Sequence, residues 1–268
     1  MFHYGTFDSA FSHAFAFFLV CVWLLLVEQW WNRPTALRSI ALGVVAAGNV
    51  LTRHTNAIYL LALPLYGVNR WDDVRRRFSE MGHRRHSLSV ATVVGVIVAL
   101  PQLALYKWTT GSWLVNAYAT HDMSFSFGSP HVAAVLFSTQ KGLFFWSPVL
   151  LLAIAGVFVA RDWPRKFAAT AVVVFALQTY LIASWPQWQF GASFGHRGFT
   201  DGFALAAPFI ASTFEWLSTR RALLIPIAIA VALAVALSTA QMIQYWTGIL
   251  PMMDTTWAQY QHVFLKFR

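Results

Sequence analysis

The sequence predicts an all-α, polytopic integral membrane protein with about eight transmembrane helices and functional loops on the extracytoplasmic side. Of its 268 residues, 58% are hydrophobic and only 11% are charged, whereas a soluble domain carries about 25% charged residues. Apolar runs long enough to cross a bilayer recur along the chain. Lys and Arg gather in the short polar segments between these runs, which is the pattern that fixes topology in a membrane.

Eight apolar segments are expected to cross the bilayer and to form a single transmembrane domain over residues 1–268. Their approximate ranges are 10–31, 36–52, 57–69, 88–106, 143–160, 167–184, 199–217 and 222–240. A span needs about 20 residues, and most of these segments qualify. The third is short, so 36–69 is interpreted as two helices joined at the polar stretch from Arg53 to Asn56.

The distribution of basic residues orients the predicted spans. Loops 32–38, 70–87, 161–166 and 218–221 hold 13 of the 19 Lys and Arg residues, which assigns them to the cytoplasmic side. Both termini are then extracytoplasmic, in a multi-pass protein of the cytoplasmic (inner) membrane. The net charge of +9 is explained by these loops and predicts contact with anionic lipid headgroups rather than with nucleic acid.

Polar and glycine-rich backbone between two long apolar runs makes 185–202 the segment most indicative of a site. Irregular backbone at membrane depth must lie against protein or in a water-filled cavity. The other long outer segments are 107–142 and the tail from 241 onward, both rich in aromatic residues. Part of this aromatic content, including Trp108, Trp146 and Trp185, is typical of an interfacial belt.

Four cations are expected at the outer ends of apolar helices: Arg53, Lys141, His196 and Arg197. Charge at that position is costly unless it has a partner. Because few acids fall on the outer side, a phosphate is a fitting partner, bound by bidentate arginine and by the point charge of lysine. The alternative is that Arg53 and Lys141 extend to lipid headgroups and Arg197 pairs with Asp201.

Asp201, Asp122 and Asp8 are the acids considered as general bases for an acceptor hydroxyl. Asp201 would stay ionised beside the cations, but the same cations would weaken it as a base, and it could equally cap a helix. Asp122 could equally be an ordinary loop acid. No metal site is predicted, because no helix carries two histidines at i, i+4 spacing. No cofactor is expected, and a divalent cation remains an open alternative.

Four sequence runs occur in an order shared with a known superfamily. They are 8–18, 48–56, 137–148 and 188–197, the last reading Trp-Gln-Phe-Gly-Ala-Ser-Phe-Gly-His-Arg. Together they resemble bacterial membrane glycosyltransferases of the GT-C superfamily, similar to the mannosyltransferase-like and aminoarabinose-transferase-like proteins. The resemblance covers about residues 8–216.

The resemblance implies transfer of a sugar from a polyprenyl-phosphate donor to a lipid, glycan or protein acceptor on the outer side of the membrane. Carried over by motif, Arg53, Lys141 and Arg197 would hold the donor phosphate, with His196 beside them. The aromatic loop 107–130 would help to cover the sugar or lipid. The aromatic contacts expected for these groups are Trp113, Tyr118, Trp188 and Phe194.

The same resemblance places the principal catalytic acid of the superfamily in a first outer loop, upstream of where this chain begins. The chain is therefore expected to be the C-terminal portion of such an enzyme, and activity of this polypeptide alone is not predicted. Two other classes stay open. One is a non-catalytic membrane subunit that binds polyprenyl phosphate or a partner transferase. The other is a transporter of lipid-linked sugar, which would be expected to show repeated halves that this sequence lacks.

Overall fold

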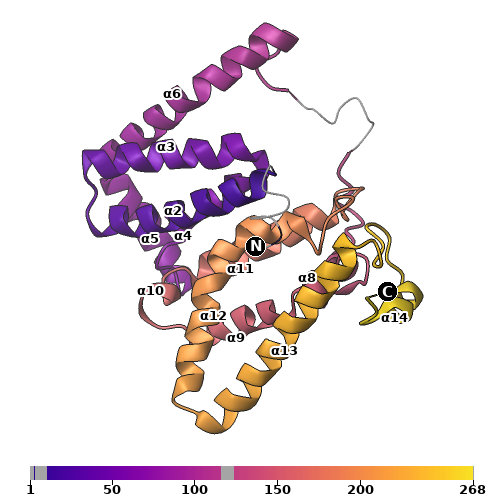
Figure 1. Ribbon diagram of the computed structural model, residues 1–268. Coiled ribbons are helices and arrows are strands. Elements are labelled where there is room, and N and C mark those ends of the chain that lie inside the picture. The colour runs from indigo at the N-terminus through magenta and orange to yellow at the C-terminus, as the bar shows by residue number, and fades with distance from the viewer. Residues whose placement is uncertain (1–2, 4–10, 116–123, 268) are drawn as a thin grey trace. The chain divides into compact units, whose positions relative to one another are not determined.

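The computed structural model describes residues 3, 11–115 and 124–267, and within them it contains helices and connecting loops without a strand. This confirms the all-α class. Three helices are long and apolar enough to cross a membrane: α2 (Ser12–Asn32), α6 (Arg85–Thr110) and α13 (Arg221–Trp246). They correspond to the predicted segments 10–31, 88–106 and 222–240 (Figure 1). The full set of eight crossings remains a prediction.

Contacts divide the chain into two compact units, which are described separately. The N-terminal unit comprises Ala10–Ser124 and Arg165–Val174, and the C-terminal unit comprises Met1–Ser9, Phe125–Pro164 and Phe175–Arg268. Helix α11 (Ala168–Ala183) contributes residues to both. The other elements of the N-terminal unit are α3 (Ala36–Thr52), η1 (His54–Leu61), α4 (Ala62–Leu65) and α5 (Trp71–His83).

Helix α3 packs against both α2 and α6 in the N-terminal unit (Figure 1). Two glycines allow α3 and α6 to approach closely. A Cβ atom on Gly43 would clash with the carbonyl oxygen of Ala91 and lie 3.1 Å from the nitrogen of Gly95. Small residues at a helix contact are the usual means of close packing inside a membrane, where helices have no hydrophobic drive to associate.

The predicted helix 57–69 is replaced by a 3-10 helix, η1, followed by the single turn of α4. Indole groups from α2 hold this irregular stretch in place. Trp23 Nε1 donates to the Tyr59 carbonyl at 2.8 Å, and Trp31 Nε1 donates to the Leu63 carbonyl at 2.9 Å. Side-chain donors therefore help to satisfy backbone groups that a regular helix would have paired internally.

The C-terminal unit is built from short helices and two longer ones. Its elements are α7 (Val132–Phe137), α8 (Leu143–Trp146), η3 (Pro148–Leu150), α9 (Leu151–Val159), η4 (Arg197–Gly202), α12 (Phe203–Ser218), α13 and α14 (Trp257–Val263); α10 (Asp162–Arg165) lies at the boundary of the two units. The predicted segment 143–160 is interrupted at Ser147-Pro148, because proline has no N–H to continue a helix.

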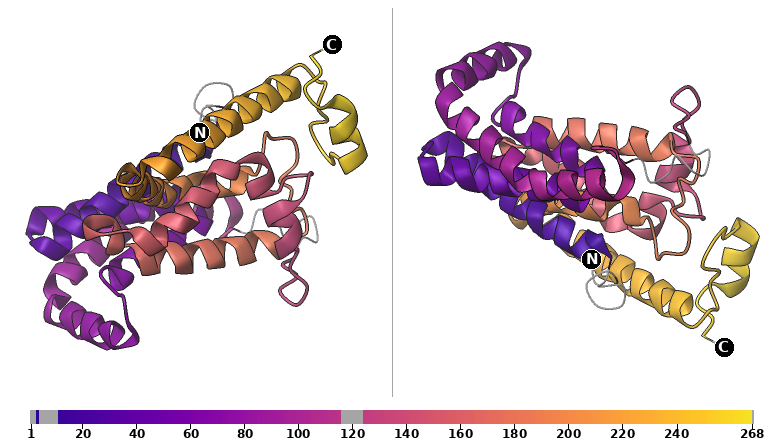
Figure 2. Two further views of the ribbon diagram at one scale, coloured as in Figure 1. Left: turned by 90° about the horizontal axis from the view of Figure 1, so that it is seen from below. Right: turned by 90° about the horizontal axis from the view of Figure 1, so that it is seen from above.

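Helix α14 lies beside the end of α13, where two glutamines tie them together (Figure 2). Gln241 Nε2 donates to the Tyr260 hydroxyl at 2.8 Å, and Gln244 Nε2 donates to the Val263 carbonyl at 2.6 Å. Elsewhere in this unit α9 packs on α12, with Gly156 against the backbone of Phe209. The chain after α13 is therefore folded back and held by specific hydrogen bonds.

We predict that Gly43→Ala lowers the free energy of unfolding by about 1–3 kcal/mol, the usual cost of overpacking, because the added methyl group meets backbone. Gly48→Ala is the matched control on the same helix, since its Cβ would lie 3.6 Å from the Leu19 side chain. Both changes gain the same helix propensity. Equilibrium unfolding in mixed detergent micelles measures the difference, and equal stability of the two variants would contradict this account of the contact between α3 and α6.

Candidate cation site in the C-terminal unit

The side chain of Lys141 is the centre of the candidate site. It follows α7 in the turn before α8, and only 4% of the residue is exposed. Its ammonium group donates to the carbonyl oxygen of Ser193 and, at 3.0 Å, to that of Met252. The Tyr245 ring lies 5.8 Å from the ammonium nitrogen. Three segments far apart in the sequence thus meet at one buried cation.

A second cation, Arg197, lies close enough to act on Lys141. Burial and, to a smaller extent, the positive charge of Arg197 lower the pKa of Lys141 to about 8, against the opposing charge of Asp254. Arg197 begins η4, is half-buried and stands over the Phe190 ring at 6.0 Å. Two positive charges therefore share a largely dehydrated environment, which favours an anionic ligand.

Aromatic rings form the wall beside Lys141. Phe194 packs against Trp146, with ring centroids 5.7 Å apart, and against Tyr245 at 6.0 Å. Trp146 is buried, and its indole N–H donates to the Thr139 carbonyl at 3.1 Å. Trp146 is therefore part of this wall, although the sequence had assigned it to an interfacial belt.

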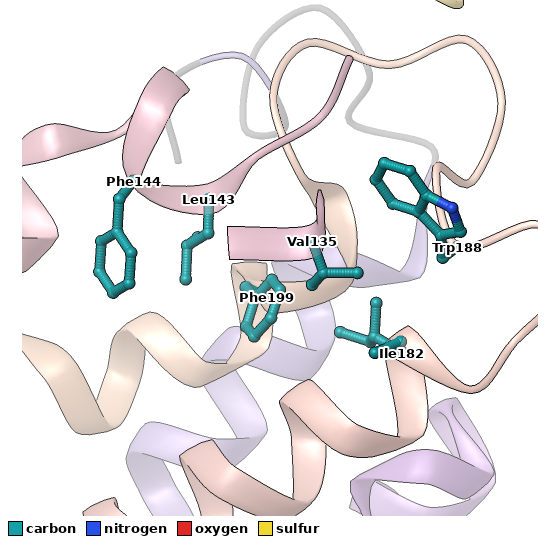
Figure 3. Packing of buried hydrophobic residues seen from close by; sticks show 7 residues of the cluster. Val135, Leu143, Phe144, Ile182, Trp188 and Phe199 are labelled. Carbon is teal, nitrogen blue, oxygen red and sulfur yellow. The ribbon is translucent and has the colours of Figure 1, made fainter. Parts of the chain in front are cut away.

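The loop that carries His196 and leads to Arg197 rests on a compact hydrophobic cluster. Figure 3 shows Val135 of α7, Ile182 of α11 and Phe199 of η4 gathered beneath it, with Trp188 of the loop at their side. Gln178 of α11 donates a hydrogen bond to the Gly198 carbonyl at 2.8 Å. Both contacts fix the backbone that follows Arg197.

His196 lies in the same loop, 5% exposed and surrounded by aromatic rings. Its ring centroid is 5.0 Å from that of Phe199, 5.7 Å from that of Phe190 and 6.5 Å from that of Trp188. Neither ring nitrogen makes a hydrogen bond within the part of the chain that the structure describes. Burial, followed by the charge of Lys141, lowers the pKa of His196 to about 3. The imidazole is therefore neutral at physiological pH.

The four predicted phosphate ligands are divided between the two units of the structure. Lys141, His196 and Arg197 all belong to the C-terminal unit, whereas Arg53 belongs to the N-terminal unit. There the Arg53 guanidinium, at the C-terminal end of α3, contacts the buried ring of His13, with Nη1 3.1 Å from Nε2. Three of the four predicted ligands, Lys141, His196 and Arg197, therefore lie in one cluster in the C-terminal unit.

The remaining predicted site residues are distributed differently. Asp201 lies in η4 and is 1% exposed. Trp113 is exposed in the N-terminal unit. Trp188 and Phe194 lie in the loop between α11 and η4. The candidates Asp8, Asp122 and Tyr118 lie outside the described residues.

Sequence reasoning missed the groups that hold Lys141. Two of them are backbone carbonyls, those of Ser193 and Met252, and a carbonyl leaves no signature in residue type. Tyr245 and Asp254 fall in the tail from 241 onward, which its aromatic content had marked as an outer segment. Nothing in their spacing connected them to Lys141.

The arrangement suits the binding of an anion. A lysine ammonium has three N–H donors, and two of them are used by the carbonyls, so one is left for a ligand. Arg197 can add a charged hydrogen bond, and neutral His196 can donate one from its ring N–H. Among residues 3, 11–115 and 124–267, no group of three His, Cys, Asp or Glu side chains that could hold a metal ion is found.

Comparisons with protein-family models, with curated proteins and with solved structures find no match to this chain. The cluster combines the buried ammonium group of Lys141, the half-buried guanidinium group of Arg197 and the neutral imidazole of His196, with aromatic rings beside them.

We predict that acid destabilises the protein partly through His196. Its folded pKa is lowered to about 3 from 6.5, so the folded state binds fewer protons than the unfolded state between these values. The contribution of the neutral His196 ring to the free energy of unfolding is complete above pH 6.5. It falls as the pH drops, by up to about 1.4 kcal/mol per pH unit. His196→Phe removes this dependence.

Thermal unfolding between pH 7 and about 4 measures the effect, with His54→Gln as the control because His54 is exposed. The wild-type and His54→Gln proteins should lose stability in parallel, and His196→Phe should lose less. A profile of His196→Phe parallel to that of the wild type would contradict the assignment of His196 as a buried neutral group.

Proposed function

We propose that the chain serves a membrane glycosyltransferase reaction, in which a sugar passes from a polyprenyl-phosphate donor to a lipid, glycan or protein hydroxyl on the extracytoplasmic side. The observation that carries the proposal is the proximity of buried Lys141 to Arg197, whose positive charge adds to the cost of keeping the Lys141 ammonium group charged. An anionic ligand removes that cost. A phosphate offers the oxygens that both side chains bind well.

The donor chemistry explains why such a site belongs in a membrane protein. A polyprenyl tail can reach the site from the bilayer while only the phosphate and sugar meet the polar loops. As the sugar leaves, negative charge grows on the phosphate, and fixed cations in a site with little water stabilise it. Phe194 and Trp188 would provide apolar contact for the sugar or the first prenyl units.

The burial of Asp201 favours a second candidate function. Its carboxylate lies in η4 and is 1% exposed, whereas a general base must come within hydrogen-bond reach of the hydroxyl that it deprotonates. A non-catalytic subunit that binds polyprenyl phosphate, or that joins a partner transferase, needs the cations but no base. A transporter of lipid-linked sugar has no observation in its favour.

We predict that Arg197→Gln weakens the binding of polyprenyl phosphate about 10- to 100-fold, the effect of losing one charged hydrogen bond. Lys107→Gln is the matched control, because this exposed lysine donates to the Gly111 carbonyl within the N-terminal unit. Thermophoresis of the detergent-solubilised chain measures the affinity. Equal binding by the two variants would place the phosphate away from the cation cluster.

A transfer assay then separates the two candidate functions. The solubilised chain is supplied with a radiolabelled polyprenyl-phosphate sugar and membrane lipid extract. Transfer that Arg197→Gln abolishes supports the enzyme. Binding without transfer supports the non-catalytic subunit or a fragment that binds polyprenyl phosphate, and absence of binding by the wild-type chain contradicts both candidate functions.

The affinity for polyprenyl phosphate should also fall as the pH rises through about 8. Lys141 binds phosphate as an ammonium ion, and its pKa is lowered to about 8. Above that value the loss approaches tenfold per pH unit. Arginine stays charged in this range, so Lys141→Arg should bind with the same affinity from pH 7 to about 9.5. A wild-type affinity that does not change with pH would exclude Lys141 as a charged ligand.

A further inference from the structure

A groove lies at the junction of α5 and α6 in the N-terminal unit. Its volume is about 510 Å³, and its lining includes Gly82 from the end of α5 and Arg85, Leu88, Ser89, Thr92 and Val93 from α6. The α6 residues follow a spacing of i, i+3, i+4, i+7 and i+8, so they share one face of that helix. From Arg85 to Val93 this face extends about 12 Å along the helix axis.

The polarity of the groove changes along its length. Arg85 stands at the first residue of α6, a helix whose length and composition suit a membrane span. Val93 lies two turns further into the apolar part and is 56% exposed, as are Val96 and Ile97 at 53% and 58%. One end of the groove therefore presents a guanidinium group, and the other end presents aliphatic side chains.

The neighbouring helix α5 has the character of an interfacial helix. Trp71 and Phe78 are seven residues apart and lie on the same side of α5, 79% and 60% exposed. Exposed aromatic residues on a charged, amphipathic helix are typical of one that lies in the headgroup region of a bilayer. This places the Arg85 end of the groove at the level of the headgroups.

The charged residues around the groove favour an anionic ligand. Residues 70–86 contain six arginines and three acids. Asp73 is bound by Arg76 at 2.8 Å and Glu80 by Arg77 at 2.8 Å. Arg85 is exposed and has no ion pair among the residues that the structure describes. Its charge is available to a ligand at the mouth of the groove.

We infer that this groove binds one anionic phospholipid, with the phosphate at Arg85 and an acyl chain along Leu88, Thr92 and Val93. The combination of a cation at one end and apolar side chains over two helical turns fits a lipid. A free phosphate would contact only the cation, Arg85. This inference does not rest on the proposed glycosyltransferase role, because the groove lies in the other unit and uses none of the same residues.

Native mass spectrometry of the full chain in detergent tests the inference. The probes are palmitoyl-oleoyl phosphatidylglycerol, phosphatidylcholine with the same chains, and glycerol 3-phosphate as the headgroup without chains. We expect one bound phosphatidylglycerol, weaker binding of phosphatidylcholine, and no displacement by glycerol 3-phosphate. Equal retention of the two lipids, or displacement by the free headgroup, would overturn the inference.

Two variants act on different ends of the groove. Arg85→Gln should weaken phosphatidylglycerol binding about fivefold, the typical contribution of one basic residue near a membrane surface, and Arg85→Lys should retain it. Gly82→Leu should block the groove with little strain, since no atom lies within 4 Å of a Cβ added there. The control is Arg221→Gln, which removes an exposed arginine at the start of α13.

Circular dichroism shows which variants are folded, and the folded variants decide the test. Loss of phosphatidylglycerol binding in Gly82→Leu, with normal binding in Arg221→Gln, supports the groove. Equal losses in Arg85→Gln and Arg221→Gln would show a general charge effect and overturn it, as would normal binding in a folded Gly82→Leu protein.

Discussion

The buried ammonium group of Lys141 joins three segments of the C-terminal unit that lie far apart along the chain. Its two carbonyl acceptors, Ser193 and Met252, lie 52 and 111 residues away along the chain. A buried lysine is stable only when its donors are satisfied and its charge is compensated, so the loops around it must keep their positions. Arg197 and the aromatic rings of Phe194, Trp146 and Tyr245 lie around the same loops, and this is the arrangement that we propose as an anion site.

A bilayer around the apolar helices would account for the difference in burial between helices and loops. Helix α13 is apolar all round, and none of its best hydrophobic window is buried inside the protein, as expected of a helix that faces lipid. Irregular backbone has no such freedom, because lipid cannot satisfy its polar groups. In the N-terminal unit the indoles of α2 bind the carbonyls of η1 and α4. In the C-terminal unit Lys141 and Gln178 do the same for the loop around Arg197.

Hydrophobic patterning predicted the bounds of α3 well, since this helix begins and ends where expected, at 36 and 52. It missed the break of segment 143–160 at Ser147-Pro148, which divides that segment into α8, η3 and α9. It failed at 57–69, where tryptophan donors from another helix support a 3-10 segment. For the site, charge in an apolar context identified Lys141, His196 and Arg197. It could not identify the carbonyls of Ser193 and Met252 or the role of Tyr245, because these contacts depend on tertiary folding and leave no local pattern.

The most direct test of a phosphate site at Lys141 and Arg197 is photo-crosslinking. A polyprenyl phosphate with a diazirine next to the phosphate would be bound to the solubilised chain, irradiated and mapped by mass spectrometry. The account predicts crosslinks within the segments 188–199 and 245–255, which surround the two cations, and their loss when unlabelled polyprenyl phosphate is added in excess. Crosslinks confined to other segments, or unaffected by that competitor, would contradict it.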